Sequence, residues 1–241
     1  MLILASDTSG ASCAVCLLED DVVRAEAFLS LGLTHSETYM PLLDDMMKTA
    51  GYTYEQVDVF ASAVGPGSFT GIRIGVSAVK TMAMVYKKPA VPVSSLKALV
   101  FPFFMLENTL VLPMLDARNK RTFAAGYWEG QLVIEEGARS VEECFSSAAS
   151  FMEEKGKGKL LLCGNAAELY REEALEKGLP VMPLFAGSKE IKGASVAYLA
   201  KEAMLSADSV NHFSAALLSP EYFAKTSAER IRDEKNEKES T

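Results

Sequence analysis

The sequence is poor in histidine and cysteine, and these shortages exclude several kinds of metal and redox site. Only two histidines occur in 241 residues, His35 and His212, so two imidazole ligands cannot come from one helical turn. One close cysteine pair exists, at positions 13 and 16, but no second pair has ligand spacing. Residues 11–18 read as a strand, on which positions three apart point to opposite faces. We therefore predict no metal site, and reduced, mostly buried thiols at Cys13, Cys16, Cys144 and Cys163.

Long apolar runs and a surplus of positive charge are also missing. No apolar run reaches the ~18 residues that a membrane-spanning helix needs, and residues 1–9 show no signal-peptide pattern. We expect a cytoplasmic protein without a membrane partner. The net charge is −8, whereas proteins that hold nucleic acid by themselves usually have a basic surface. The charge argues against nucleic acid as a strong direct partner. The content of 49% apolar and 23% charged residues is typical of a globular protein.

Residues 59–75 contain the most distinctive pattern, an apolar run that ends at Gly65-Pro66-Gly67 and leads into a helical pattern. The helix N-terminus after such a turn carries unpaired N–H groups and partial positive charge, which suit an anion. A Walker loop would need a lysine in the turn, and a dinucleotide fingerprint would need glycine where Thr70 stands. Neither motif is present, so an anion-binding turn is one of two interpretations.

The other interpretation is tight helix packing. Gly71 and Gly75 lie four residues apart and share one helix face with Ala78 and Met82. Glycine inside a helix costs roughly 1 kcal/mol relative to alanine. Two glycines on one face therefore indicate close approach by another backbone.

The chain repeats one order of elements: strand, aspartate, polar turn, two strands, helix, strand, helix, strand. Asp7 and Asp116 hold the same place in the two cycles, which predicts two similar α/β lobes with both aspartates at the cleft between them. The predicted domains are 1–105, 106–225 and a charged tail, 226–241. The expected strands are 2–6, 12–18, 22–30, 57–64, 90–93, 109–115, 122–128, 131–137, 159–163 and 179–183, and the expected helices are 35–50, 68–88, 141–155, 166–177 and 194–205.

The first helix begins with an apparent capping box, Thr34-His35-Ser36-Glu37, and Pro41 predicts a kink inside it. The two front helices together carry five of the eleven methionines: Met40, Met46, Met47, Met82 and Met84. Such stripes are common in protein cores, but they also suit surfaces that fit more than one partner.

Four stretches resemble the TsaB (YeaZ) family. They are the glycine stretch 65–75, Asp7-Thr8-Ser9, His35-Ser36-Glu37 and Asp116-Ala117-Arg118. Residues 220–222 resemble the family's C-terminal Pro-x-Tyr, but Phe223 and Ala224 replace its usual Leu-Arg. The resemblance implies a duplicated actin/hexokinase/Hsp70-like (ribonuclease-H-like) α/β fold.

The resemblance also implies a function in which the chain is not the catalyst. TsaB proteins assist the transfer of threonylcarbamoyl to the adenosine beside the tRNA anticodon, as partners of the catalytic paralogue TsaD and the ATPase TsaE. TsaD has a His-x-x-x-His metal pair, where this sequence has Ser95 and Leu99. The family implies a homodimer when TsaB is alone, indirect contact with tRNA, no resident cofactor, and ATP or ADP only at the assembled complex.

The family pairs its first two long helices with those of the partner. We therefore predict partner contacts at His35, Tyr39, Met40, Leu43, Met46, Met47, Gly71, Gly75, Ala78 and Met82. We also predict that a charge at Met47 or Gly75 abolishes docking and leaves the fold intact. The candidate nucleotide- or anion-binding residues are Asp7, Thr8, Ser9, Gly65, Gly67, Asp116 and Arg118, and no catalytic residue is assigned.

Two alternatives stay open. An active ATPase or kinase of the same fold would use Asp7 and Asp116 to position a metal and water. Against it, neither aspartate is followed by a glycine-rich phosphate hairpin. A protease would need a serine with a histidine partner, and no serine has one in its motif.

Overall fold

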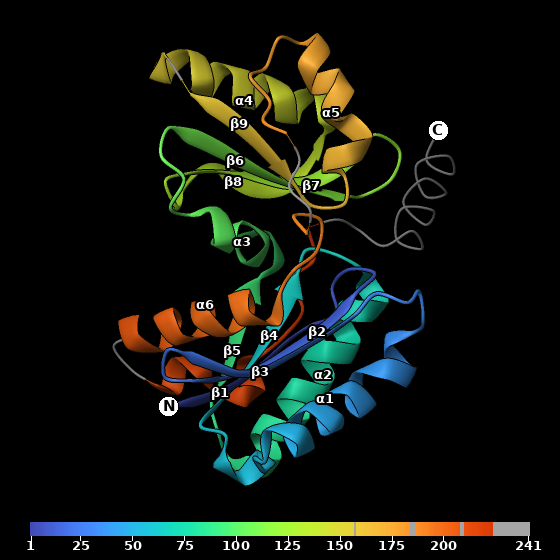
Figure 1. The fold of residues 1–241 in the computed structure, drawn as a ribbon, viewed down its shortest axis with the longest axis vertical. Helices are drawn as coiled ribbons and strands as arrows, with labels where there is room; N and C mark the ends of the chain where they lie inside the picture. The colour runs from blue at the N-terminus through green and yellow to red at the C-terminus, as the bar shows by residue number, and fades with distance from the viewer. Residues whose placement is uncertain (157, 184–186, 208–209, 224–241) are drawn as a thin grey trace, which may run out of the picture.

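The computed structural model describes residues 1–156, 158–183, 187–207 and 210–223, which form two α/β lobes stacked one above the other (Figure 1). The first sheet has the strand order β3-β2-β1-β4-β5. Its strands are β1 (Leu2–Asp7), β2 (Cys13–Glu19), β3 (Val22–Leu29), β4 (Val59–Gly65) and β5 (Ala90–Ser94). The second sheet has the order β8-β7-β6-β9, with β6 (Thr109–Asp116), β7 (Arg121–Trp128), β8 (Gln131–Ser140) and β9 (Lys159–Cys163). The predicted tail, 226–241, lies outside the described residues.

The pairing pattern confirms the predicted duplication. Strand β1 is antiparallel to β2 and parallel to β4, and β6 is likewise antiparallel to β7 and parallel to β9. The predicted strand 179–183 is wrong, because this segment makes only the parallel bridge between Leu160 and Val181. Pro180 and Pro183 lack the N–H groups that a longer ladder would need. The bridge still lies beside β9, where β5 lies beside β4 in the first sheet.

Helices pack on both faces of each sheet, because α3 also contacts β6 and β7 on the inner face of the second sheet (Figure 1). The long helices α1 and α2 lie on the outer face of the first sheet, and α4 and α5 lie on the outer face of the second. Helices α6 and α3 lie between the two sheets; α3 was not predicted. Their bounds are α1 (His35–Ala50), α2 (Phe69–Tyr86), α3 (Ser95–Val100), α4 (Val141–Lys155), α5 (Ala167–Glu176) and α6 (Gly193–Ser206). Short 3-10 helices span Tyr54–Gln56, Phe101–Phe103, Val210–Phe213 and Ala215–Leu217.

The middle of three hydrophobic clusters joins the two lobes. It contains Ile3 of the first sheet, Leu161 of the second, and Leu96 of α3 between them. Apolar side chains that exclude water therefore fill the space between the sheets. Helix α6 belongs to this layer and packs on β1 and β2, although the predicted division 106–225 grouped it with the second lobe. The division into domains stays a prediction.

The start of α1 differs from the prediction. Thr34 is the N-cap, but its side chain accepts no backbone N–H group, so the capping box is absent. The Thr34 hydroxyl instead donates to the carboxylate of Glu37. The helix continues through Pro41 to Ala50 and is capped by Gly51, whose φ of 76° lies in the left-handed region that glycine tolerates. The predicted kink at Pro41 stays a prediction.

Candidate functional site

The glycine turn docks α2 onto the turn that follows β1. Strand β4 ends at Gly65, and the chain passes through a cis Gly65-Pro66 bond to the N-cap Ser68. The Ser68 N–H donates to the carbonyl oxygen of Ser9 at 2.7 Å, and the Gly71 N–H donates to the Ser68 hydroxyl oxygen at 3.2 Å. Two donors that an anion would use are therefore bonded within the chain. The anion-binding interpretation of Gly65 and Gly67 stays a prediction.

Gly71 and Gly75 allow α2 to approach the chain's own Thr8. A Cβ atom on Gly71 would lie 2.1 Å from the Thr8 carbonyl oxygen, and one on Gly75 would lie 2.4 Å from Thr8 Oγ1. The Thr8 hydroxyl also donates to the Gly71 carbonyl oxygen at 2.7 Å. Close approach by another backbone is thus confirmed at Gly71, where that backbone belongs to the same molecule, whereas the close neighbour of Gly75 is the Thr8 side chain. Both glycines are buried, which does not favour their prediction as partner contacts.

Most of the predicted partner contacts on α1 and α2 point into the molecule. Tyr39, Leu43, Met46 and Met47 are buried against the first sheet, and Met47 is only 2% exposed. His35, Ala78 and Met82 are half-buried. Of the predicted set only Met40 is exposed, at 41%.

The exposed apolar side chains of α2 lie elsewhere than predicted. Met84 is 60% exposed and Val85 is 66% exposed, and Phe69 is exposed at the start of the helix. The 3.6-residue period of the helix could have predicted this exposure. Met84 and Val85 lie away from the buried stripe of α2, which contains Ile72, Val76, Val79 and Ala83. The outer face of α1 and α2 points away from the second lobe (Figure 1).

The two matching aspartates have opposite environments. Asp7 is 1% exposed, and burial raises the pKa of its carboxyl group to about 6, although the Ser9 contacts and His35 act in the other direction. Its Oδ1 accepts the Ser9 N–H at 3.0 Å, while its Oδ2 has no hydrogen-bond partner among the described residues. Asp116 is exposed, and its Oδ1 accepts the Arg118 N–H at 2.9 Å. A buried Asp7 is out of reach of a bound substrate, which weakens the ATPase alternative.

The remaining residue-level expectations concern histidine, cysteine and membrane helices. His35 Nε2 lies 3.0 Å from the Gly10 carbonyl oxygen, and this contact connects the start of α1 to the β1–β2 turn.

All four cysteines are buried and free, and Cys13 and Cys16 lie in different core clusters on opposite faces of β2. Within the described ranges, no three His, Cys, Asp or Glu residues are arranged to hold a metal ion, and no helix is long and apolar enough to cross a membrane.

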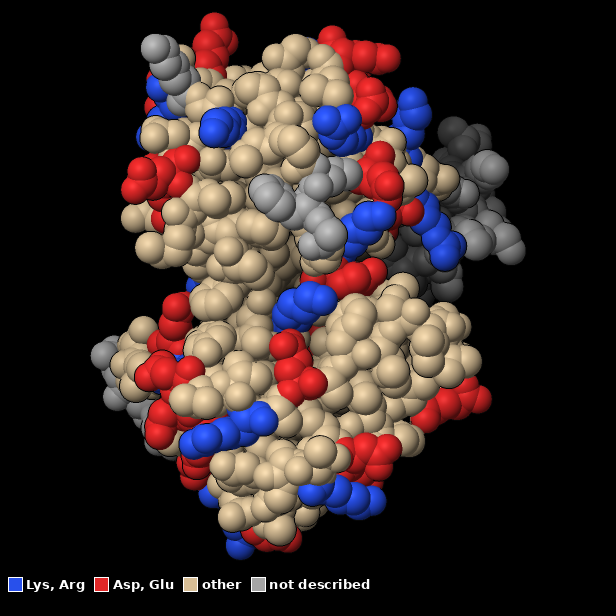
Figure 2. Space-filling view, in the orientation of Figure 1, with Lys and Arg blue, Asp and Glu red and all other residues tan. Residues whose placement is uncertain are grey.

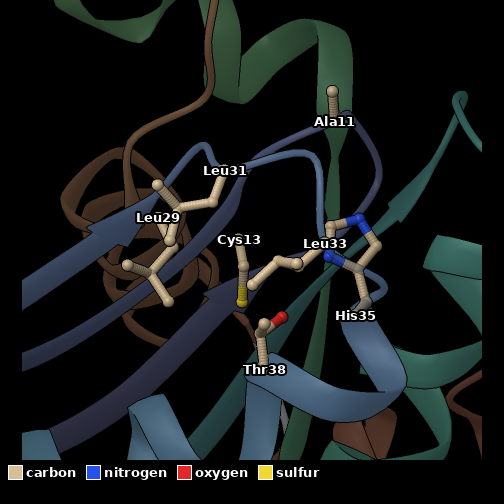
Figure 3. Close-up of a pocket in the computed structure, with 7 residues that line it drawn as sticks. All are labelled: Ala11, Cys13, Leu29, Leu31, Leu33, His35 and Thr38. Carbon is tan, nitrogen blue, oxygen red and sulfur yellow. The ribbon is translucent and has the colours of Figure 1, made fainter.

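A small pocket lies beside the start of α1 (Figure 3). Its walls are apolar apart from Thr38 and His35, and they come from the β1–β2 turn, β2, the end of β3, the loop before α1 and the first turn of α1. A nucleotide phosphate needs cationic or multiple N–H donors, and the one side chain of this lining that can carry positive charge is His35. The lining residues are Ala11, Cys13, Leu29, Leu31, Leu33, His35 and Thr38.

Sequence comparison decides the family. Residues 32–229 match the family model of TsaD, the tRNA N6-adenosine threonylcarbamoyltransferase. The chain is 30% identical over 172 residues to the tRNA threonylcarbamoyladenosine biosynthesis protein TsaB of Bacillus subtilis, covering 71% of this chain and 74% of that protein. The chain belongs to the TsaB (YeaZ) family. The Escherichia coli TsaB is 32% identical over 139 residues, which are 54% of this chain and 60% of its own length.

A solved structure agrees with this assignment at the level of the fold. YeaZ from Pseudomonas aeruginosa superimposes with a TM-score of 0.70 at 24% identity, over 92% of this TsaB-family chain and 99% of that one. The relatives' names and the family assignment indicate a role in tRNA threonylcarbamoyladenosine biosynthesis.

Proposed function

We propose that this TsaB-family chain is a non-catalytic docking subunit that pairs with TsaD through the outer face of α1 and α2. The observation that carries the proposal is the exposure of Met40, Met84 and Val85 on these two helices, which lie on the face of the first sheet away from the second lobe. Exposed apolar side chains on a helix pair favour packing against another helix pair. The pairing supports transfer of threonylcarbamoyl to tRNA by the TsaD subunit.

The chemistry of this face suits more than one partner. Methionine has an unbranched, polarisable side chain that adapts to different neighbours. The same face therefore serves a homodimer when the chain is alone and a heterodimer with TsaD when it is present. TsaE and tRNA join through the assembled complex. Figure 2 supports the indirect role of tRNA, because Lys and Arg are interspersed with Asp and Glu on the displayed face and form no basic stripe there.

The proposal that the chain does not catalyse rests on two positions. Ser95 and Leu99 stand where the family resemblance puts the metal-binding histidines of TsaD, and both are buried in α3. The burial of Asp7 supports the same proposal. ATP or ADP would then bind only at the complex.

The test introduces charge on the exposed face. The earlier choice of Met47 or Gly75 is unsuitable, because both are buried and a charge there would damage the fold. We expect Met84→Asp combined with Val85→Asp to weaken TsaD binding at least about tenfold, since an interface core tolerates unpaired charge poorly. The measurement is titration calorimetry with purified TsaD, followed by a tRNA transfer assay that needs both subunits.

A matched control is available on the other lobe. Leu169 on α5 is 64% exposed, a fraction similar to the 60% of Met84, so Leu169→Asp is matched to the single variant Met84→Asp and places its charge away from the proposed face. We expect this variant to bind TsaD like the unmodified chain. Equal binding by the Met84/Val85 variant, with its fold intact, would reject the proposal.

A further inference from the structure

Helix α1 packs along one side of α2, and residues 214–222, which we call the C-terminal strap, pack along the other side. Lys80 Nζ donates to the carbonyl oxygens of Ala216 at 2.9 Å and Leu218 at 3.0 Å. Ala215 and Leu218 are buried in the same core cluster as α2, and the Glu221 N–H donates to the Val64 carbonyl oxygen at 2.8 Å. Helix α2 therefore lies between α1 and the strap, and its outer stripe is not covered by any of the described residues.

The end of the strap forms a cluster with Arg73 and Phe69 at the start of α2. The rings of Phe69 and Tyr222 lie 5.0 Å apart, and the Arg73 guanidinium carbon lies 3.8 Å from the Phe69 centroid and 5.6 Å from the Tyr222 centroid. Arg73 Nε donates to the Tyr222 hydroxyl oxygen at 2.7 Å. Two aromatic contacts and one hydrogen bond fix the plane of the guanidinium.

The outer end of this guanidinium is open. Arg73 is an exposed residue, and within the described part of the chain the Tyr222 hydroxyl is its one hydrogen-bond acceptor and no carboxylate lies within ion-pair distance. A guanidinium held through Nε still offers the N–H donors of its two Nη atoms. These donors match a carboxylate, and a pre-ordered side chain loses little conformational entropy when it binds one.

We propose that Arg73 is the point at which the docked TsaD subunit places an aspartate or glutamate carboxylate. This inference rests on the proposed docking of α1 and α2. Arg73 and Met84 lie on nearly the same side of α2, because eleven residues correspond to about three helical turns, so one partner surface reaches both. Arginine beside aromatic rings is typical of the few residues that dominate interface energies.

A protein carboxylate is favoured over an RNA phosphate by the surroundings of Arg73. Its helix face continues into apolar Met84 and Val85, which a phosphate backbone would not cover. The chain as a whole has a net charge of −8, which repels a polyanion.

The test compares two variants of Arg73 over a range of ionic strength. We expect Arg73→Gln to raise the dissociation constant for TsaD about tenfold at low salt and to flatten its salt dependence, because a charged contact across an interface is screened. Arg73→Lys keeps the salt dependence but recovers only part of the affinity, since lysine lacks the planar fork. Reversing the charge with Arg73→Glu, together with arginine at the facing TsaD carboxylate, restores binding.

The control and the outcomes separate this inference from the docking proposal. Lys155 on α4 also lies over aromatic rings, those of Trp128 and Phe151, so Lys155→Gln changes the net charge equally in the other lobe. It should bind TsaD normally. If the unmodified chain does not bind TsaD, docking itself fails. If it binds and Arg73→Gln binds with the same affinity and salt dependence, only the role of Arg73 is rejected. Loss of binding to a short RNA with unchanged TsaD binding would make Arg73 a phosphate contact and overturn the inference.

Discussion

The turns after β1 and β6 hold equivalent places in the duplicated fold, yet their aspartates differ in burial and in the chain segments that contact the turn. Asp7 is buried, and α2 closes over its turn through the Ser68–Ser9 hydrogen bond and the contact between Gly71 and Thr8. Asp116 is exposed, and the turn after it runs through three successive residues with positive φ, Arg118, Asn119 and Lys120. The two turns therefore share one local contact, the aspartate Oδ1 accepting the N–H two residues on, and differ in burial.

The difference follows from the helix that lies next to each turn. In the first lobe, two helical glycines let α2 touch the turn, whereas in the second lobe Asn165 reaches Asp116 instead, its Oδ1 accepting the Asp116 N–H at 2.8 Å. Duplication thus preserves the sheet order, while each helix and its small residues set the access to the aspartate. The first lobe gains a rigid support for α1 and α2, and the second keeps an open polar turn.

The largest expected effect comes from filling the contact between α2 and the first turn. Gly71→Ala places a methyl group 2.1 Å from the Thr8 carbonyl oxygen, so backbone must move. We expect a loss of about 3 kcal/mol in the free energy of unfolding, the upper end for overpacked sites. Urea denaturation followed by circular dichroism measures it.

Gly137→Ala on β8 is the control in the other lobe. Its Cβ would meet only the flexible end of Arg139, at 3.8 Å, so its unfolding free energy should stay within about 1 kcal/mol of the unmodified chain, the ordinary range for a glycine-to-alanine exchange. Equal losses in the two variants would show that the contact at Thr8 does not distinguish the lobes.

A second effect comes from the buried carboxyl group of Asp7. Its pKa is raised from 3.8 to about 6 by burial, so the folded state favours the neutral form. The contribution of the neutral Asp7 carboxyl group to the free energy of unfolding is fully present below pH 3.8. It decreases as the pH rises from 3.8 and is lost once the pH passes about 6. Relative to Asp7→Asn, the unmodified chain should lose about 2–3 kcal/mol of unfolding free energy over this range.

The comparison needs the exposed aspartate as its control. Asp116→Asn makes the same substitution at an exposed carboxylate and is measured across the same pH values. Chemical denaturation at several pH values measures all three proteins. A parallel curve for Asp7→Asn would show that Asp7 is ionised in the folded state without penalty.

Local sequence patterns predicted most helices and strands, because hydrophobic periodicity and turn-forming residues depend only on neighbouring positions in the chain. The two cycles, the opposite faces of Cys13 and Cys16, and close packing at Gly71 and Gly75 were all predictable. The identity of the neighbour was not, because Thr8 is 63 residues away from Gly71 and the glycine pattern does not name its partner.

The candidate site shows the same limit. Methionine spacing predicts which residues share a helix face but not which face meets the sheet, so Met46 and Met47 were predicted as contacts and are buried. The strap and its Arg73–Tyr222 hydrogen bond join positions 149 residues apart, and no local pattern indicates that pairing. The family resemblance indicated which two helices contact the partner, whereas the structure shows which of their side chains are exposed.

The smallest expected effect contrasts the helix starts of the two lobes. Helix α4 has a complete capping box, in which the Ser140 hydroxyl accepts the Glu143 N–H and the Glu143 carboxylate accepts the Ser140 N–H. The Thr34 side chain of α1 accepts no backbone N–H. Ser140→Ala should therefore lower the free energy of unfolding by about 1 kcal/mol, the usual value of an N-cap hydrogen bond. Thr34→Ala removes no such bond and should lower it by only about a few tenths of a kcal/mol. Thermal unfolding of both variants measures the difference. If Thr34→Ala proved as costly as Ser140→Ala, the start of α1 would be capped in solution, and the outer face of the first lobe would be held more firmly than its hydrogen bonds indicate.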